Sequence, residues 1–311
     1  MTVLASGSKG NATVVASQRT RVLVDAGLSC RELLRRMAVA EEDPAALDAI
    51  LITHEHRDHV SGLSVLARRL RIPVYFTEPT HRAWVRQVTP RSNMTYAQWM
   101  EQVQREKKAC AELEIAGSAE VVSDPDPEVE DSPAGRTRRD PTFLPAVEYF
   151  HPGTKFLIGD LTVSPFTTPH DAADPCGFVF DCAAESARMA IATDLGYLPP
   201  NVKSALRRID VLLLESNHDL DMLKDGPYPW AVKQRVLSRV GHLSNNATAE
   251  FLARDYDGAA TTIVLGHLSE ANNAPELALL SAEQALDERG SRIGSRVLLA
   301  QQSAPLAPIC L

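Results

Sequence analysis

Residues 54–59 read His-Glu-His-Arg-Asp-His and contain three histidines and two carboxylates. Neutral imidazoles and ionised carboxylates are the nitrogen and oxygen ligands that divalent transition metals take up. His54 and His56 can point to one metal site, and Asp58 and His59 can serve a second site beside it. The chain holds only 9 histidines, so a chance cluster of three is improbable. The alternative is a polar loop in which Asp58 only caps a helix.

Three further candidate ligands each follow a strand-like run elsewhere in the chain. His170 comes after the run 161–166, Asp194 after an apolar run ending at residue 191, and His267 after a third such run. The ends of strands are where α/β proteins place functional groups. Each of these residues alone could be a hydrogen-bonded core residue or a turn residue. With the first cluster, they predict seven metal ligands at separate strand ends: His54, His56, Asp58, His59, His170, Asp194 and His267.

The elements that would position these ligands alternate between strands and helices. Apolar and alternating runs predict strands near residues 3–5, 12–16, 21–27, 49–53, 73–76, 156–158, 161–166, 177–182, 188–192, 210–215 and 261–265. Helical periodicity and composition predict helices over residues 30–38, 60–70, 81–88, 96–114, 200–207, 229–240, 245–255 and 274–288. Because strands and helices interleave, the fold class is α/β. The ligand-rich segment then lies in a tight loop between a strand and a helix.

The composition is that of a globular protein. Apolar residues make up 44% of the chain, which is enough for a packed core, and no apolar run approaches the length of a membrane span. The first residues lack the basic and long apolar stretches of a signal peptide. The five cysteines are scattered and form no C-x-x-C pair, which suits a reducing compartment and disfavours thiolate metal sites. We therefore expect a cytoplasmic protein without a membrane partner.

Length and charge leave two questions open. The 311 residues could form one domain or two; we expect a single domain over 1–311, with a low-order insert at 100–145 that is rich in proline and charge. The formal net charge of −8 disfavours binding to nucleic acid, because nucleic-acid-binding proteins usually carry a basic surface. The net charge is not spread evenly, however: acidic residues cluster at 124–131, and basic residues cluster at 203–208 and 224–239. These basic residues form either a phosphate-facing surface or ordinary solvated helix faces.

The ligand series, taken in chain order, resembles that of the metallo-β-lactamase fold superfamily. Further similarity lies in the segments 6–11, 215–219, 226–230, 241–245 and 266–269. These segments carry a closer resemblance, to the YycJ/WalJ group, which covers nearly the whole chain except roughly residues 100–145. It implies a four-layer αβ/βα sandwich with a dinuclear metal site along one edge. It also implies nuclease activity that acts from 5′ to 3′ on duplex DNA.

The resemblance also implies how the ligands are shared between two ions. One ion would be held by His54, His56 and His170, the other by Asp58, His59 and His267, and Asp194 would bridge them. Two divalent ions about 3.5–4 Å apart can share a hydroxide that attacks phosphorus in line with the leaving oxygen. Ligation by nitrogen and oxygen alone suits Zn²⁺, Mn²⁺ or Fe²⁺. Asp25, at another strand end, is a candidate acceptor for the N–H of a ligand histidine, or else a turn residue.

The leaving sugar oxygen needs a proton, and Glu215 and His242 are candidates to provide it. Glu215 ends the apolar run 211–214, and His242 lies in a Gly-His-Leu-Ser-Asn loop before a helix. The pair is similar to that of ribonuclease Z, where a strand-end glutamate orients a histidine that donates to the leaving group. A carboxylate partner raises the pKa of a histidine and fixes its tautomer, as a general acid requires. With Asp58, these are the predicted catalytic residues, and His218 is a second candidate for the acid.

A further set of side chains is predicted to contact substrate phosphate. Backbone N–H groups at a helix start bind phosphate, and a glycine-rich turn can cradle one. Helix capping by Ser244 and an ordinary hairpin turn over residues 6–11 are the plain alternatives. The candidate phosphate contacts are Ser6, Asn11, His218, Ser244 and Asn245.

Three functions are compatible with these residues. The first is a dinuclear-metal phosphodiesterase acting on nucleic acid, most simply a 5′-to-3′ DNA exonuclease. The second is a small-molecule metallohydrolase of thioesters, lactones or β-lactams, and the third is a non-catalytic regulatory module. Glu215, His242 and the basic residues before them favour the first, because ester hydrolysis does not need them. The identity of the metal and the oligomeric state stay open.

Overall fold

The computed structural model describes residues 1–89, 140–288 and 295–311. Residues 1–86 and 142–311 form one unit, which carries both sheets and the metal-ligand candidates. A second unit spans residues 87–141, and most of it lies outside the described residues. The helix predicted at 96–114 and nearly all of the predicted insert fall there.

Six strands form the first sheet, in the order of the chain. The first three pair antiparallel as a meander, and the third to the sixth pair parallel. The parallel pairs are joined by helices, as the geometry of a parallel crossover requires. The strands are β1 (Thr2–Ala5), β2 (Ala12–Ala16), β3 (Arg21–Val24), β4 (Ala49–Leu51), β5 (Val74–Phe76) and β6 (Val147–Tyr149).

Seven strands form the second sheet, in the order β13-β12-β11-β10-β9-β8-β7. The strands from β7 to β10 pair antiparallel, and those from β10 to β13 pair parallel. β11 and β12 are almost continuously apolar and buried along their whole length, as is typical of strands covered on both faces. The strands are β7 (Phe156–Ile158), β8 (Leu161–Thr167), β9 (Cys176–Cys182), β10 (Ala187–Ala192), β11 (Val211–Glu215), β12 (Thr262–Gly266) and β13 (Arg296–Leu299).

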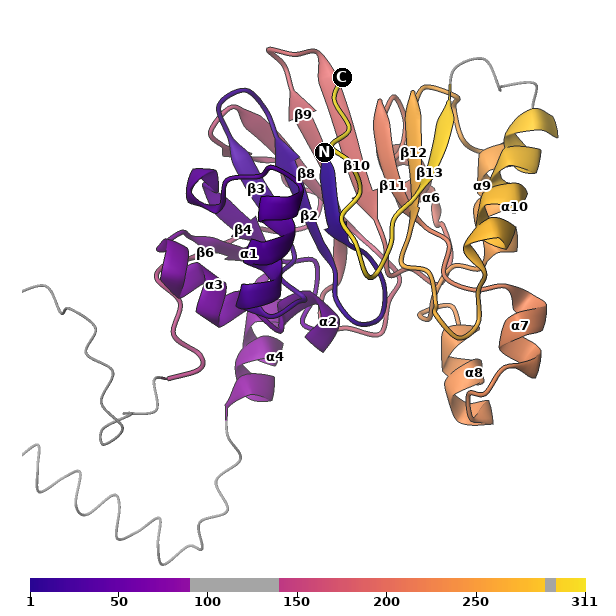
Figure 1. Ribbon diagram of the computed structural model, residues 1–311, viewed down its shortest axis with the longest axis horizontal. Coiled ribbons are helices and arrows are strands. Elements are labelled where there is room, and N and C mark those ends of the chain that lie inside the picture. Colours follow the sequence, from indigo (N-terminus) through magenta and orange to yellow (C-terminus); the bar gives the residue numbers. More distant parts are fainter. Residues whose placement is uncertain (90–139, 289–294) are drawn as a thin grey trace, which may run out of the picture. The chain divides into compact units, whose positions relative to one another are not determined.

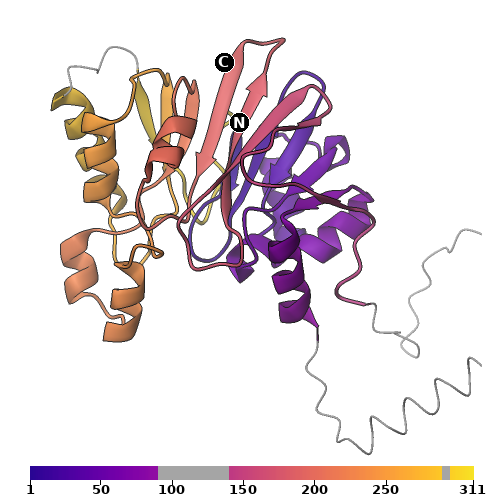
Figure 2. The same ribbon diagram turned by 180° about the vertical axis from the view of Figure 1, so that it is seen from behind.

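The two sheets face each other, and helices cover their outer faces (Figures 1 and 2). α1 and α3 lie outside the first sheet, and α9 and α10 lie outside the second. This arrangement confirms the predicted four-layer αβ/βα sandwich. The helices are α1 (Cys30–Val39), the 3₁₀ turn η1 (Pro44–Ala46), α2 (Arg57–Val60), α3 (Leu63–Leu70), α4 (Glu78–Val88), α6 (Pro200–Ala205), α7 (Leu220–Asp225), α8 (Trp230–Val236), α9 (Asn245–Arg254) and α10 (Pro275–Glu288).

Alternate residues of the central strands pack into two different cores. On β11, Leu213 joins the core between the sheets, together with Val24 and Phe178. Its neighbours Leu212 and Leu214 join the core beneath the outer helices of the second sheet. This alternation follows from the two-residue repeat of a strand, which sends successive side chains to opposite faces. Burial on both faces holds the strand ends, and hence the loops that follow them, in fixed positions.

The helix predicted over residues 60–70 is wrong in its extent. The chain instead forms α2 directly after His56 and then α3, with Gly62 between them. A Cβ on Gly62 would lie 2.1 Å from the carbonyl oxygen of Leu28, and the Gly62 N–H donates to Ala26 O at 2.8 Å. The close approach of this loop bends the chain and separates the two helices. Asp58 therefore lies in a helical turn, not in the predicted loop.

Four elements have no counterpart in the sequence prediction. These are the short edge strands β6 and β13, the 3₁₀ turn η1 and the six-residue helix α7. The predicted helix 229–240 is shorter in the structure, because α8 ends at Val236. No helix among the described residues is long and apolar enough to cross a membrane.

Candidate metal centre

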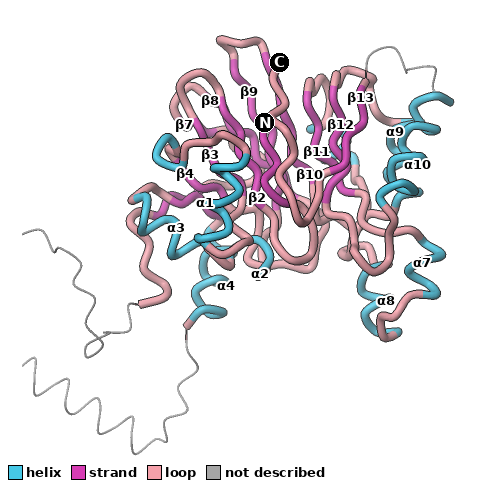
Figure 3. The backbone as a smooth tube through the Cα atoms, in the orientation of Figure 1, coloured by secondary structure: helices cyan, strands magenta, loops and turns pink. Residues whose placement is uncertain are grey.

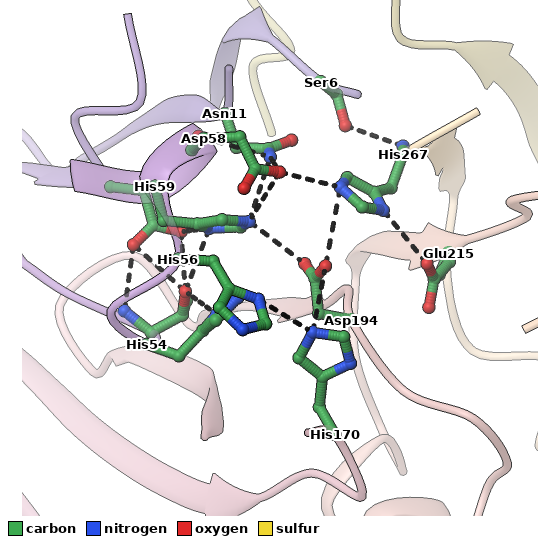
Figure 4. Close-up of polar contacts among 12 residues, drawn as sticks. Ser6, Asn11, His54, His56, Asp58, His59, His170, Asp194, Glu215 and His267 are labelled. Carbon is green, nitrogen blue, oxygen red and sulfur yellow. Dashed lines mark hydrogen bonds and ion pairs between the residues drawn. The ribbon is translucent and has the colours of Figure 1, made fainter. Parts of the chain in front are cut away.

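The loops that follow the strands converge at one edge of the two sheets (Figure 3). All seven predicted ligands lie there, in loops or on the short helix α2. They form overlapping sets of imidazole nitrogens and carboxylate oxygens, and within each set these atoms lie within 4.8 Å of one another. Figure 4 shows the side chains pointing toward a common centre.

The first set consists of His54, His56 and His170. Nε2 of His170 lies 3.2 Å from Nδ1 of His56. On the other side of the ring, Nδ1 of His170 donates to the carbonyl oxygen of Gly241 at 3.1 Å. This contact places the proton on Nδ1 and leaves Nε2 facing the set. Burial, reinforced by the neighbouring imidazoles, lowers the pKa of His54 well below its usual range, and only a neutral imidazole can ligate a metal.

The second set consists of Asp58, His59 and His267. Nε2 of His59 lies 3.5 Å from Asp58 Oδ2, and Nε2 of His267 lies 3.6 Å from the same oxygen. The opposite nitrogen of each ring contacts a buried carboxylate. Nδ1 of His59 lies 2.7 Å from Asp25 Oδ2, and Nδ1 of His267 lies 3.0 Å from Glu215 Oε1. Such carboxylates fix the tautomer of a ligand histidine and turn its free nitrogen toward the metal.

Asp194 lies between the two sets. Its Oδ2 is 3.4 Å from Nε2 of His59, and its Oδ1 is 3.5 Å from Nε2 of His267 and 4.0 Å from Nε2 of His170. Burial opposes ionisation of this carboxyl, but the surrounding histidines lower its pKa on balance. A carboxylate that reaches members of both sets has the position that a bridging ligand needs.

Three residues of the centre have positive φ: Asp25 (63°), Asp194 (60°) and His267 (56°). Each follows a strand closely, and a left-handed backbone there turns the chain sharply toward the centre. Such a conformation costs about 1–3 kcal/mol for a residue with a side chain. Neighbouring hydrogen bonds maintain it: Asp25 N–H donates to Leu51 O at 2.8 Å, and His267 N–H donates to Ser6 Oγ at 2.8 Å.

Several buried polar atoms of the centre make no hydrogen bond within the described chain. Among them are Nε2 of His54, Nε2 of His267 and Oδ2 of Asp194. A buried polar atom without a partner costs about 1–3 kcal/mol, so protein interiors rarely leave such atoms unpaired. Each of the two sets contributes one of these atoms, Asp194 between them contributes the third, and all are of the type that binds divalent transition metals. The residues therefore fit a dinuclear metal site.

Two residues that support the centre were missed in the sequence analysis. Oγ1 of Thr53 donates to Asp25 Oδ2 at 2.8 Å and lies 3.1 Å and 3.2 Å from Nδ1 of His54 and of His59. Glu55 accepts the N–H of Ala173 at 2.9 Å and so ties the loop of the first histidines to the loop of His170. Their place directly beside the ligands was the only sequence signal.

Glu215 and His242 form a close pair beside the two sets. Nδ1 of His242 lies 2.7 Å from Glu215 Oε1, the same oxygen that contacts His267. The other oxygen, Oε2, accepts the N–H groups of Leu195 at 2.8 Å and Leu243 at 3.3 Å. Burial opposes ionisation of Glu215, but His242 and His267 hold its pKa well below the usual range. The carboxylate is thus charged at neutral pH and shared by two histidines.

His218, the second candidate for the acid, lies in a different environment. Its side chain is buried, its Nδ1 lies 3.4 Å from Asn217 Oδ1, and its Nε2 makes no hydrogen bond. Burial lowers its pKa to about 4, although Glu215 acts in the opposite direction. It belongs to none of the potential metal-binding sets, whereas His242 lies in one with Asp194, Glu215 and His267. This geometry favours His242 as the proton donor.

The other predicted phosphate contacts make structural hydrogen bonds. Ser6 holds the backbone of His267, and Asn11 Nδ2 lies 3.0 Å from Nε2 of His59. Ser244 caps α9 by accepting the N–H of Ala247, and Asn245 Oδ1 accepts from Ser216 Oγ at 2.7 Å. A phosphate contact by any of them stays a prediction.

Comparison with known proteins places the chain in a family. Residues 5–232 match the model of the metallo-beta-lactamase superfamily. The chain is 34% identical to "Exodeoxyribonuclease YycJ" of Bacillus anthracis and 32% identical to "Exodeoxyribonuclease WalJ" of Streptococcus pneumoniae. Each alignment covers 94% of this chain and 90% of the relative.

Solved structures show the same fold at much lower identity. The metallo-beta-lactamase fold protein YhfI of Bacillus subtilis aligns with a TM-score of 0.61 at 14% identity, over 98% of both chains. The short form of human tRNase Z aligns with a TM-score of 0.55 at 17% identity, over 99% of both chains. With its buried His/Asp cluster, the chain therefore belongs to the metallo-β-lactamase superfamily, as a metal-dependent hydrolase related to the YycJ/WalJ exodeoxyribonucleases.

Proposed function

We propose that this protein is a two-metal phosphodiesterase that degrades DNA as a 5′-to-3′ exonuclease. Two relatives named exodeoxyribonucleases match it over 94% of its length, which favours DNA as the substrate. The 5′-to-3′ direction follows from the resemblance to the YycJ/WalJ group. The observation that carries the proposal is the pair Glu215–His242 beside the metal-binding sets.

The seven predicted ligands would hold two divalent ions, Zn²⁺, Mn²⁺ or Fe²⁺. His54, His56 and His170 would hold one, Asp58, His59 and His267 the other, and Asp194 would bridge them. When bound, such a pair of ions neutralises charge on phosphoryl oxygens and makes water a nucleophile near neutral pH. The chain itself orients the imidazoles, through Asp25 on His59, Glu215 on His267 and the Gly241 carbonyl on His170.

His242 is placed to hold the proton that the leaving group needs. Its Nδ1 faces Glu215 Oε1 at 2.7 Å, so its Nε2 is available to a substrate. The His242 side chain is 21% exposed, whereas that of Glu215 is fully buried. The pair therefore spans the boundary between the protein interior and the surface from which substrate enters. The carboxylate accepts from Nδ1 and so fixes the orientation of the ring, with Nε2 directed away from Glu215, as donation to a sugar oxygen requires.

The same pair favours phosphodiester cleavage over hydrolysis of small thioesters, lactones or β-lactams. A deoxyribose oxygen leaves a phosphodiester poorly unless a proton is supplied, so a dedicated acid contributes strongly to that reaction. If Glu215 served only to orient His267, the same carboxylate oxygen would not need a second, partly exposed histidine.

The test is digestion of DNA duplexes labelled at the 5′ end or the 3′ end, with single-stranded DNA and RNA beside them. The full-length protein is loaded separately with Zn²⁺, Mn²⁺ or Fe²⁺, and Asp194→Asn serves as the control for contaminating nucleases. We expect mononucleotides to appear first from the 5′ label. Release from the 3′ label, internal cuts, or equal activity of Asp194→Asn would contradict the proposal.

A further inference from the structure

α8 has an unusual distribution of side chains. Among its seven residues, the only one buried is Lys233, whose Nζ donates to the carbonyl oxygen of Lys224 at 2.6 Å. Trp230, the first residue of the helix, is 67% exposed, and Val232 is exposed as well. A surface helix of a globular protein normally turns its apolar side chains inward and its charges outward. Here a lysine points inward and a tryptophan outward, which marks the helix as a surface for a partner.

The segment that contains this helix contacts the loops that carry two of the predicted metal ligands. We call residues 220–240, which contain α7 and α8, the arm. The N–H of Asp171 donates to Val240 O at 3.1 Å, and the His170 ring donates to Gly241 O at 3.1 Å. Arg235 forms an ion pair with Asp171, and a Cβ on Gly196 would lie 2.5 Å from the backbone of Arg239. The end of the arm thus packs on the loops that carry His170 and Asp194.

The arm also lies on the same side of the molecule as the metal centre. In Figures 1 and 2, α7 and α8 project beyond the strand ends at the same edge as α2, which carries Asp58 and His59. His242 follows the arm directly in the sequence. A partner that contacts α8 would therefore continue toward the proposed proton donor.

The charge of the arm differs from that of the chain. The chain has a formal net charge of −8, but the arm contains four basic residues against two acidic ones, and both acidic residues lie in its first six positions. Arg239 is exposed, and its guanidinium lies 4.4 Å from the ring centre of Tyr197. Exposed aromatic rings flanked by basic groups are how proteins hold single-stranded nucleic acid, because rings stack on bases and cations face phosphates.

We propose that the arm is a guide for a single DNA strand, in which a base of the strand stacks on Trp230 and its backbone passes Arg239. This proposal rests on the proposed function, because it assigns the binding surface of the same nucleic-acid site. The basic charge favours a nucleic acid strand as occupant over a second copy of this acidic chain.

The experiment measures binding without turnover. Metal-loaded, full-length protein is titrated into a fluorescent, phosphorothioate-linked single-stranded oligonucleotide, and anisotropy gives the Kd. Trp230→Ala should weaken binding by roughly 5- to 150-fold, which corresponds to the loss of one base stacked on an aromatic ring. Trp230→Phe should restore most of the affinity, and Trp230→Leu should not, because leucine is apolar but cannot stack. Phe143→Ala is the matched control: Phe143 is a 57% exposed aromatic residue remote from the arm in sequence, and its removal should leave the Kd unchanged.

Equal Kd values for wild type and Trp230→Ala would overturn the proposal, as would wild-type protein that binds no oligonucleotide. Light scattering on the same samples tests the competing occupant: a wild-type dimer that Trp230→Ala makes monomeric, with unchanged Kd, would assign the surface to a second copy instead. The proposed function is judged separately by cleavage of unmodified DNA. Wild type that binds through Trp230 but never cleaves would refute the nuclease and leave the arm as a binding surface.

Discussion

Removal of His242 should separate substrates by their leaving groups. His242→Ala deletes the donor at 2.7 Å from Glu215 Oε1, but Glu215 keeps His267 and the backbone amides of Leu195 and Leu243. The buried carboxylate therefore remains well bonded, and the metal-binding sets should survive. A general acid contributes about 10²- to 10⁴-fold, which at about 1.4 kcal/mol per tenfold is roughly 3–5 kcal/mol of transition-state stabilisation. DNA, whose leaving group is a sugar oxygen, should lose rate by that factor.

The assay compares DNA with bis(4-nitrophenyl) phosphate, whose phenolate leaves without a proton. We expect His242→Ala to lose kcat strongly on DNA and far less on the nitrophenyl ester, with unchanged metal content. His151→Ala serves as the control, since His151 is exposed and outside every set of potential ligands. Equal losses on both substrates would refute the acid role and indicate phosphate binding by His242 instead. Full activity on DNA without His242 would move the acid role to His218 or to water.

Glu215→Gln should behave differently from His242→Ala, although both residues belong to one pair. A glutamine cannot present a charged oxygen to two imidazoles at once, so His267 loses its orientation together with His242. We therefore expect Glu215→Gln to slow both substrates and to weaken metal binding. A Glu215→Gln protein that is impaired only on DNA would show that the carboxylate acts on His242 alone.

Three further changes test the centre and its surroundings. His56→Ala should lose about one equivalent of metal, as measured by elemental analysis, together with most turnover, because the ion that His54, His56 and His170 would hold loses one of its few ligands; wild-type rates would contradict the dinuclear site. Asp25→Asn should weaken metal affinity by roughly 10- to 100-fold, since His59 Nδ1 loses its carboxylate, and a competing chelator measures this loss. Glu32 has its pKa lowered to about 2 by hydrogen bonds from Arg35 and Arg36, so it stabilises the fold above its unfolded pKa of about 4.5, and this stabilisation disappears as the pH falls through the folded value. The urea midpoint of Glu32→Gln should therefore lie below wild type near pH 7 and approach it only as the pH falls to about 2.

The metal ligands could be predicted from the sequence because their residue types and close spacing are typical of metal sites. Histidine is scarce in this chain, and three histidines in six residues after an apolar run left few alternatives to a metal loop. The sequence also named Asp25 and the pair Glu215–His242 as candidates for supporting roles, but it could not show which ligand each carboxylate contacts, because these contacts join residues far apart in sequence. Nothing in the sequence near Glu215 indicates that one of its oxygens serves both His242 and His267.

The unpredicted elements have local physical causes. β6 is three residues long and none of them is buried, so its sequence lacks the alternation of apolar and polar residues that predicts a strand. α7 is only six residues long and depends on the side chain of Asp219, which accepts from Asp221 and Met222 at the helix start. The division between α2 and α3 depends on how closely Gly62 approaches Leu28, which is a contact between separate segments.

The left-handed backbone at Asp25, Asp194 and His267 sets a trade-off between stability and activity. Glycine adopts positive φ without steric penalty, so a chain selected for stability alone would favour glycine at all three positions. It would also avoid the buried, unpaired atoms on Asp194 and His267. Variants that replace Asp194, whose Oδ2 makes no hydrogen bond in the described chain, should then be inactive yet lose little stability, and a screen for thermal stability alone would select against the hydrolase.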